Sequence, residues 1–92
     1  MDKKTEVALE LLYKVAKDIK TEEEAQFFFK TLLTEKETQL IAQRLYVSKL
    51  LSENKVYSEI VEDTGASSAT VSRVKRAMIA DREYFDRMLY GK

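Results

Sequence analysis

The chain has 92 residues, enough for a single domain with a small core, and 45% of them are hydrophobic. It contains no proline, no cysteine and only two glycines, which excludes disulfides and favours an all-α fold. Sixteen basic and sixteen acidic residues cancel, which argues against a protein that coats nucleic acid by bulk charge. Any affinity for DNA must therefore come from local charge.

The first predicted element is an amphipathic helix from Thr5 to Ile19. Its apolar residues recur every three or four positions, with lysines and glutamates on the other side. They are Val7, Ala8, Leu11, Leu12, Val15, Ala16 and Ile19. The scattered charges are not those of a signal peptide or a membrane span, so we expect a cytoplasmic protein.

A second helix is predicted to begin at Glu22, because Thr21 and Glu24 have the spacing of a capping box. It runs through the successive aromatic residues Phe27, Phe28 and Phe29, which point around more than half of the helix. A monomer of this size cannot cover all three. We therefore expect a partner subunit over them, with partial exposure as the alternative.

The longest predicted helix follows Thr34, which opens a second capping-box pattern with Glu37, and it extends to about Ser52. Its core side is predicted to carry Leu40, Ile41, Leu45, Val47, Leu50 and Leu51, whereas Gln39 and Gln43 are expected on the other side. Asn54 is a suitable C-terminal cap.

Two shorter helices are predicted around Gly65, the first beginning at Tyr57 and the second ending at Ala80. Gly65 suits a backbone that leaves the first helix with positive φ, and the hydroxyls of Ser67 and Ser68 can cap the second. Apolar residues then recur at helical spacing: Ala69, either Val71 or Ser72, Val74 and Met78. This pattern is typical of a DNA-reading helix-turn-helix, although an ordinary helical hairpin with a solvated basic end fits it too.

The other face of that second helix carries small polar residues first and cations later, an order that suits entry into a major groove. We predict that Ser67, Ser68, Ala69, Thr70 and Ser72 face bases, that Arg73, Lys75 and Arg76 face phosphates, and that Tyr57 and Ser58 anchor the first helix to the DNA backbone. Asp81 can cap a sixth and last helix from Arg82 to Leu89, which has Tyr84, Phe85, Met88 and Leu89 to bury. With no linker or repeat visible, residues 1–92 are expected to form one domain.

Catalysis is not expected. The chain lacks histidine and cysteine, and so lacks the usual general base, thiol nucleophile and commonest transition-metal ligands. It also has no glycine-rich phosphate loop and no calcium loop, and Ser67, Ser68 and Ser72 have no neighbouring base in sequence. We expect no metal, no cofactor and no enzyme.

The stretch from Leu32 to Met78 resembles the trp repressor superfamily, and it is closer to the YerC/YecD-like branch than to the tryptophan-sensing repressor. The matching elements are Leu33-Thr34 at the start of a long helix, Arg44 and the run Thr-Gly-Ala-Ser-Ser-Ala-Thr-Val-Ser-Arg that ends at Arg73. The resemblance implies a six-helix subunit that interleaves with a second copy as a homodimer. Its two recognition helices would meet successive major grooves, roughly 34 Å apart.

In the tryptophan-sensing repressor, two arginines and a threonine surround the ligand. Thr34, Arg44 and Arg73 match them, but each has another reading, as a helix cap or as a surface or phosphate-binding cation. Val74 departs from the pattern, because the family's site has a glycine there that leaves room for the indole ring. A valine side chain fills that space, so the resemblance implies a vestigial pocket, and free tryptophan is not expected to bind.

The first hypothesis is thus a homodimeric bacterial transcription regulator. It would bind double-stranded DNA in a sequence-specific manner and act as a repressor without depending on tryptophan. Ser58 and Val61 stand where the repressor has basic side chains, which favours a second hypothesis: a helical protein-interaction module that has lost DNA binding. A third is a repressor gated by some other small ligand between Arg44 and Arg73.

Overall fold

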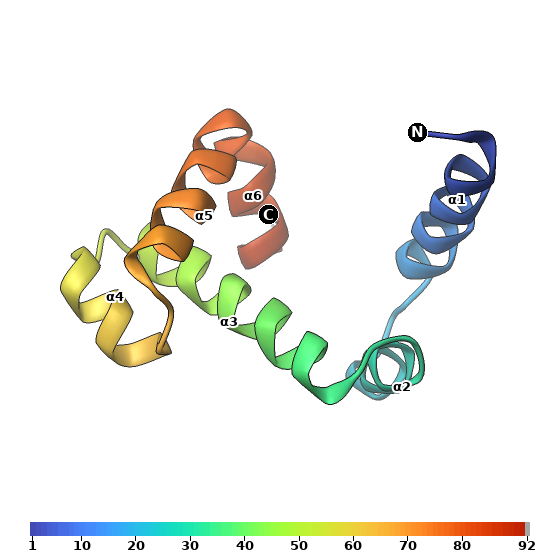
Figure 1. The fold of residues 1–92 in the computed structure, drawn as a ribbon, viewed down its shortest axis with the longest axis horizontal. Helices are drawn as coiled ribbons and strands as arrows, with labels where there is room; N and C mark the ends of the chain where they lie inside the picture. The colour runs from blue at the N-terminus through green and yellow to red at the C-terminus, as the bar shows by residue number, and fades with distance from the viewer. Residues whose placement is uncertain (92) are drawn as a thin grey trace. The chain divides into compact units, whose positions relative to one another are not determined.

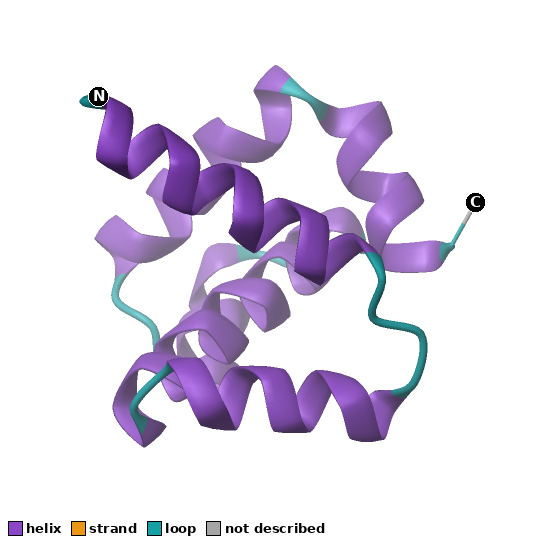
Figure 2. Ribbon diagram, turned by 90° about the vertical axis from the view of Figure 1, so that its right-hand side faces the viewer, coloured by secondary structure: helices purple, strands orange, loops and turns teal. Residues whose placement is uncertain are grey.

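The computed structural model describes residues 1–91 (Figure 1), so Lys92 of the predicted 1–92 domain lies outside the described residues. Within them the chain forms six α-helices and no strand, which confirms the all-α prediction (Figure 2). The helices are α1 (Lys3–Lys17), α2 (Glu22–Leu32), α3 (Glu35–Ser52), α4 (Tyr57–Thr64), α5 (Ser68–Ala80) and α6 (Arg82–Tyr90). No helix in this part of the chain is long and apolar enough to cross a membrane.

The backbone divides into two compact units. The first unit, Met1–Thr34, contains α1 and α2, and the second begins at Glu35 and contains α3 to α6.

Side-chain caps set the helix starts in the first unit. α1 begins two residues earlier than predicted, because the Asp2 carboxylate accepts a hydrogen bond from the Thr5 N–H at 2.8 Å. At the start of α2 the Thr21 hydroxyl accepts from the Glu24 N–H at 3.0 Å, as predicted. The Glu24 carboxylate accepts from the Lys20 N–H at 3.2 Å, one residue before the N-cap whose N–H it would bind in a standard capping box.

The two helices of the first unit do not cover each other's apolar faces. Neither α1 nor α2 contains a buried residue. Phe27 is 73% exposed, whereas Phe28 is half-buried and its ring meets that of Phe29 edge to face, with centroids 5.6 Å apart. The two helices line an open apolar groove of about 930 Å³. Its walls include Leu11, Leu12, Val15, Phe27, Phe28 and Leu32.

The core of the second unit lies where α3, α4 and α5 pack together (Figure 1). This core consists of Val47, Leu50, Ile60, Ala66 and Val71, with Leu51, Val61 and Val74 packed partly buried against it. Ala66, which the helical spacing does not mark as a core residue, is 3% exposed. Of the two alternatives on α5, Val71 is fully buried and Ser72 is half-buried.

The predicted core side of α3 is correct only from Val47 onward. Val47 is fully buried, but Leu40, Ile41 and Leu45 are 46%, 45% and 49% exposed. The reason is that α4 and α5 pack on the side of α3 that carries Val47 and Leu50, whereas the other helices of the second unit leave the remaining apolar side chains of α3 partly exposed.

The ends of α3 and α6 use left-handed residues. Asn54 has φ 61°, as its predicted role as a C-terminal cap requires, and hydrogen bonds join the Lys55 N–H to the Leu50 carbonyl and the Asn54 N–H to the Leu51 carbonyl. This pair of bonds is a Schellman motif. α6 extends one residue beyond its predicted end, to Tyr90, and stops at a glycine of φ 69°.

Two predictions for α6 are wrong. Asp81 stands at the N-cap position, but its side chain makes no capping hydrogen bond. Tyr84 and Met88, predicted to be buried, are 71% and 61% exposed, because α6 packs mainly against α5. The half-buried apolar residues of α6 are Phe85 and Leu89. The Tyr90 hydroxyl is hydrogen bonded to that of Ser52, which ties the end of α6 to the end of α3.

Candidate nucleic-acid interface

The turn between α4 and α5 is built as the sequence predicted. Gly65 has φ 74° and ψ 4°, and its N–H donates to the Val61 carbonyl at 2.9 Å. The Thr64 hydroxyl donates to the Ile60 carbonyl at 2.7 Å and accepts from the Ala66 N–H at 3.1 Å. These short-range bonds fix the direction in which the chain enters α5.

A longer-range bond holds this turn against α3. The Gln43 side-chain amide donates to the Thr64 carbonyl at 3.1 Å, across 21 positions in the sequence. Gln43 is half-buried, so the prediction that it lies away from the packed side of α3 is wrong. No local pattern signals this contact, because it depends on how α3 crosses the end of α4.

At the start of α5, Ser67 is the N-cap. Its hydroxyl accepts from the Thr70 N–H at 3.1 Å and donates to the Thr70 hydroxyl, also at 3.1 Å. Ser68 is the first helical residue and makes no cap bond in residues 1–91. Ser67 and Ser68 are both exposed, whereas Thr70 is half-buried.

α5 has a packed face and an open face. Val71 and Met78 are buried and Val74 is half-buried, while Ala69, which its apolar spacing assigned to the packed face, is exposed. The predicted phosphate contacts Arg73, Lys75 and Arg76 are exposed as well, and none of them forms an ion pair with a carboxylate in residues 1–91. The ion pairs found there, Arg82 with Asp86 and Arg87 with Glu83, lie within α6. The cations of α5 therefore remain available to an external anion.

α4 begins next to one of these cations. The Lys75 Nζ lies 5.5 Å from the centroid of the Tyr57 ring, and Tyr57 is 37% exposed. The N-cap residue Val56 offers no side-chain acceptor to the first N–H groups of the helix. Ser58 is exposed at the same end. Open N–H groups at a helix N-terminus suit a phosphate oxygen.

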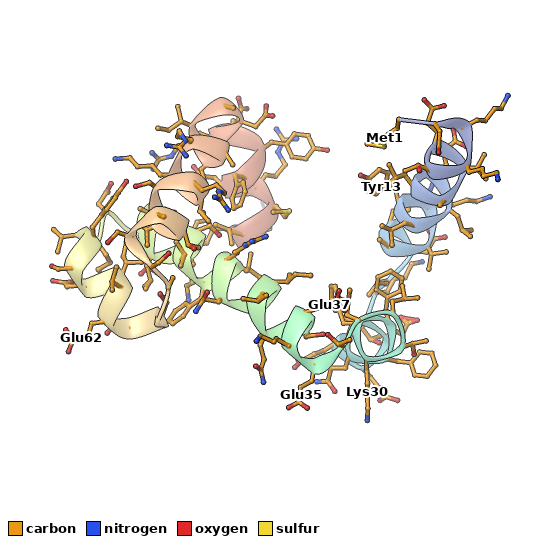
Figure 3. The ribbon with its side chains drawn as sticks, viewed as in Figure 1. Met1, Tyr13, Lys30, Glu35, Glu37 and Glu62 are labelled. Carbon is orange, nitrogen blue, oxygen red and sulfur yellow. The ribbon has the colours of Figure 1, made fainter. Side chains whose placement is uncertain are left out.

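The rest of α4 is acidic. Glu59, Glu62 and Asp63 are all exposed, and Glu62 projects from the outer side of the helix (Figure 3). α4 and α5 thus present opposite charges, with the basic residues all on α5.

The residues of the predicted vestigial pocket are divided between the two units. Thr34 is the last residue of the first unit, whereas Arg44 is exposed on α3 and Arg73 is exposed on α5, in the second unit. Val74 packs against the core of the second unit. Among residues 1–91, no group of three or more acidic side chains is arranged to hold a metal ion.

Two short helices joined by a glycine turn, with the polar and basic face of the second left open, define a helix-turn-helix protein. A family model described as Trp repressor protein matches residues 7–91. The chain belongs to the Trp repressor family, and the match extends well beyond the Leu32–Met78 stretch that carries the sequence resemblance.

Individual relatives agree with this assignment. The chain is 42% identical to the uncharacterized protein YerC of Bacillus subtilis strain 168 over 78 residues, which span 85% of this chain and 75% of YerC. The crystal structure of a TrpR-like protein from Eubacterium eligens superposes with a TM-score of 0.81 at 38% identity, covering 88% of this chain and 84% of that one. A candidate Trp repressor from Staphylococcus aureus also reaches 0.81, at 35% identity, covering 90% and 83%.

Proposed function

We propose that this protein is a transcription regulator that binds double-stranded DNA in a sequence-specific manner as a homodimer, and that it represses by covering a promoter. The observation that carries this proposal is the open face of α5, where Arg73, Lys75 and Arg76 are exposed without carboxylate partners. Membership of the Trp repressor family supports the same role. A DNA regulator of this kind would act in the cytoplasm.

The proposed contacts follow from exposure and reach. Ser68 and Ala69 are short and exposed at the start of α5, so the helix backbone can approach base edges there. Ser67, Thr70 and Ser72 complete the base-facing group, although Ser67 and Thr70 also bond to each other. Tyr57 and Ser58, at the uncapped start of α4, would meet the DNA backbone.

The homodimer is proposed because one chain leaves two apolar surfaces without cover. One is the groove between α1 and α2, and the other is the exposed apolar side of α3 with Leu40, Ile41 and Leu45. A second copy that interleaves with the first would bury both and present two α5 helices to successive major grooves. In that assembly the two units would act as one domain.

The test is selection from a random DNA library with the full chain, followed by fluorescence anisotropy on the enriched duplex. We expect an enriched near-palindrome. Lys75→Ala and Arg76→Ala should each weaken binding of all sequences and lower the slope of log Kd against log salt by about 0.9. Lys30→Ala, on an exposed lysine of α2, is the control and should leave the slope unchanged. The proposal is wrong if no sequence is enriched, or if both α5 variants bind like the control.

We propose further that tryptophan is not the effector. Val74 stands where the tryptophan-sensing repressor has a glycine that leaves room for the indole ring, and its side chain packs against the core. Calorimetry with the full chain should show no heat of tryptophan binding. Micromolar binding would contradict this.

Two other functions have specific support. The exposed acids Glu59, Glu62 and Asp63 favour a protein-interaction module without DNA binding, which the library selection would reveal by enriching nothing. Exposed Arg44 and Arg73 on neighbouring helices favour a repressor gated by an anionic ligand. A thermal-shift screen of small anions would detect that ligand.

A further inference from the structure

The contact between Lys75 and Tyr57 joins the two helices of the helix-turn-helix. Tyr57 is the first residue of α4 and Lys75 lies in the middle of α5, and the lysine Nζ is 5.5 Å from the ring centroid. Both side chains are exposed, so the contact is on the surface rather than in the core.

This arrangement differs from the other cation–ring contact found in residues 1–91. Arg87 lies 5.8 Å from the Tyr84 ring, but both residues belong to α6 and the same Arg87 is ion paired with Glu83. Lys75 has no carboxylate partner in residues 1–91, and its ammonium group lies over the Tyr57 ring.

We propose that Tyr57 is a positioning residue whose ring holds the Lys75 ammonium ready for a DNA phosphate; this inference rests on the proposed function. A free lysine side chain loses rotamer freedom when it binds an anion. A ring that already restrains the chain reduces that loss. The ring face occupies one side of the ammonium group and accepts no directed hydrogen bond, so the N–H donors on the other side stay free for phosphate oxygens.

The inference is tested by a double-mutant cycle on the full chain, with the enriched duplex as the probe and Kd as the readout. Tyr57→Leu should weaken binding about two- to fivefold, the range expected for an exposed cation–ring contact. In the Lys75→Ala background the same change should have a smaller effect, because no ammonium group remains to be positioned and only the direct backbone contact of Tyr57 is lost. Tyr57→Phe keeps the ring and should lose less affinity than Tyr57→Leu.

Further measurements separate this role from a purely structural one. Far-UV circular dichroism should be the same for all variants, and Tyr84→Leu, which removes the ring of the α6 contact, should leave Kd unchanged. In NMR spectra of the wild type, the Lys75 ε-protons should be shifted upfield by the Tyr57 ring, and this shift should disappear in Tyr57→Leu. The shift should persist in Tyr57→Phe.

Three outcomes would overturn the inference. Equal losses for Tyr57→Phe and Tyr57→Leu would mean that the hydroxyl, rather than the ring, is what matters. Additive effects of Tyr57→Leu and Lys75→Ala would mean that the two residues act independently. If either result appears while the wild type binds DNA, only this inference fails. If the wild type binds no DNA, the proposed function fails and the inference fails with it.

Discussion

The side-chain amide of Gln43 donates a hydrogen bond to the carbonyl oxygen of Thr64, the last residue of α4, at 3.1 Å. The two residues belong to different helices, and Thr64 directly precedes the glycine at which the chain turns into α5. α3 therefore supports the turn itself, and the support should be measurable.

Replacing Gln43 with methionine keeps the length of the side chain and removes the donor. We expect a loss of about 1 kcal/mol in the free energy of unfolding, because the Thr64 carbonyl is left part-buried without this partner. Urea denaturation measures it. Gln39→Met, on an exposed glutamine one turn earlier in α3, is the matched control and should change stability little. Equal effects of the two changes would contradict a specific role for Gln43.

The turn glycine can be tested by adding a methyl group. Gly65 has φ 74°, and a Cβ there would meet the Gln43 amide at 3.8 Å, an ordinary contact. Gly65→Ala should therefore destabilise the protein through backbone strain alone, by about 1–2 kcal/mol. Gly91 has a similar φ of 69° at the end of α6 with nothing within 4 Å of an added Cβ. Gly91→Ala should cost much less in thermal unfolding, because α6 contains no buried residue and its last turn can open locally. A smaller effect at Gly65 than at Gly91 would refute this account.

A charge placed on the exposed apolar part of α3 tests the homodimer. Leu45 is 49% exposed in one chain, so Leu45→Glu is compatible with the fold of a single chain but would put a carboxylate into the proposed interface. Light scattering should give twice the chain mass of 10.7 kDa for the wild type and the single mass for the variant. Lys30→Glu, on an outward-pointing lysine of α2, should remain dimeric (Figure 3). A monomeric wild type would refute the dimer.

The start of α1 should respond to acid. The hydrogen bond from the Thr5 N–H lowers the pKa of Asp2 below its ordinary value, since the bond favours the charged carboxylate. The capping contribution to α1 is therefore complete above the unfolded-state pKa of about 3.9 and is lost as the pH falls through the lower folded-state pKa. An NMR titration of the Asp2 carboxyl measures this. Asp2→Asn, which can still cap, should remove the pH dependence and keep the helix start.

Removing a charge from α4 should strengthen DNA binding. Glu62 is exposed on α4, the first helix of the helix-turn-helix, and its carboxylate repels DNA phosphates at low salt. Glu62→Gln should raise affinity for all duplexes by about twofold, the scale of a single exposed charge. Glu10→Gln, on exposed α1, removes the same charge from outside the proposed interface. An equal gain from both would point to a general charge effect instead.

The helix boundaries were largely predictable because local chemistry sets them. Thr21, Gly65 and Ser67 each terminate or start a helix through bonds to residues within four positions. Asp81 shows the limit of this reasoning, since it occupies an N-cap position without making the bond.

Contacts between distant parts of the chain were not predictable. Nothing near Gln43 in the sequence marks its bond to Thr64, and nothing near Tyr57 marks Lys75 as its neighbour. The same holds for burial on α3, because apolar residues occur all around that helix and helical spacing cannot show which of them meet α4 and α5. The base and phosphate contacts of α5 remain predictions.

Neither helix of Met1–Thr34 has a buried side chain within one chain. Under the proposed pairing, most of the order in this segment would be gained only when two chains meet. When the chain is scarce, the concentration of the dimer would then rise with the square of the chain's concentration. A modest change in synthesis would therefore switch the promoter more sharply than it would for a monomeric regulator.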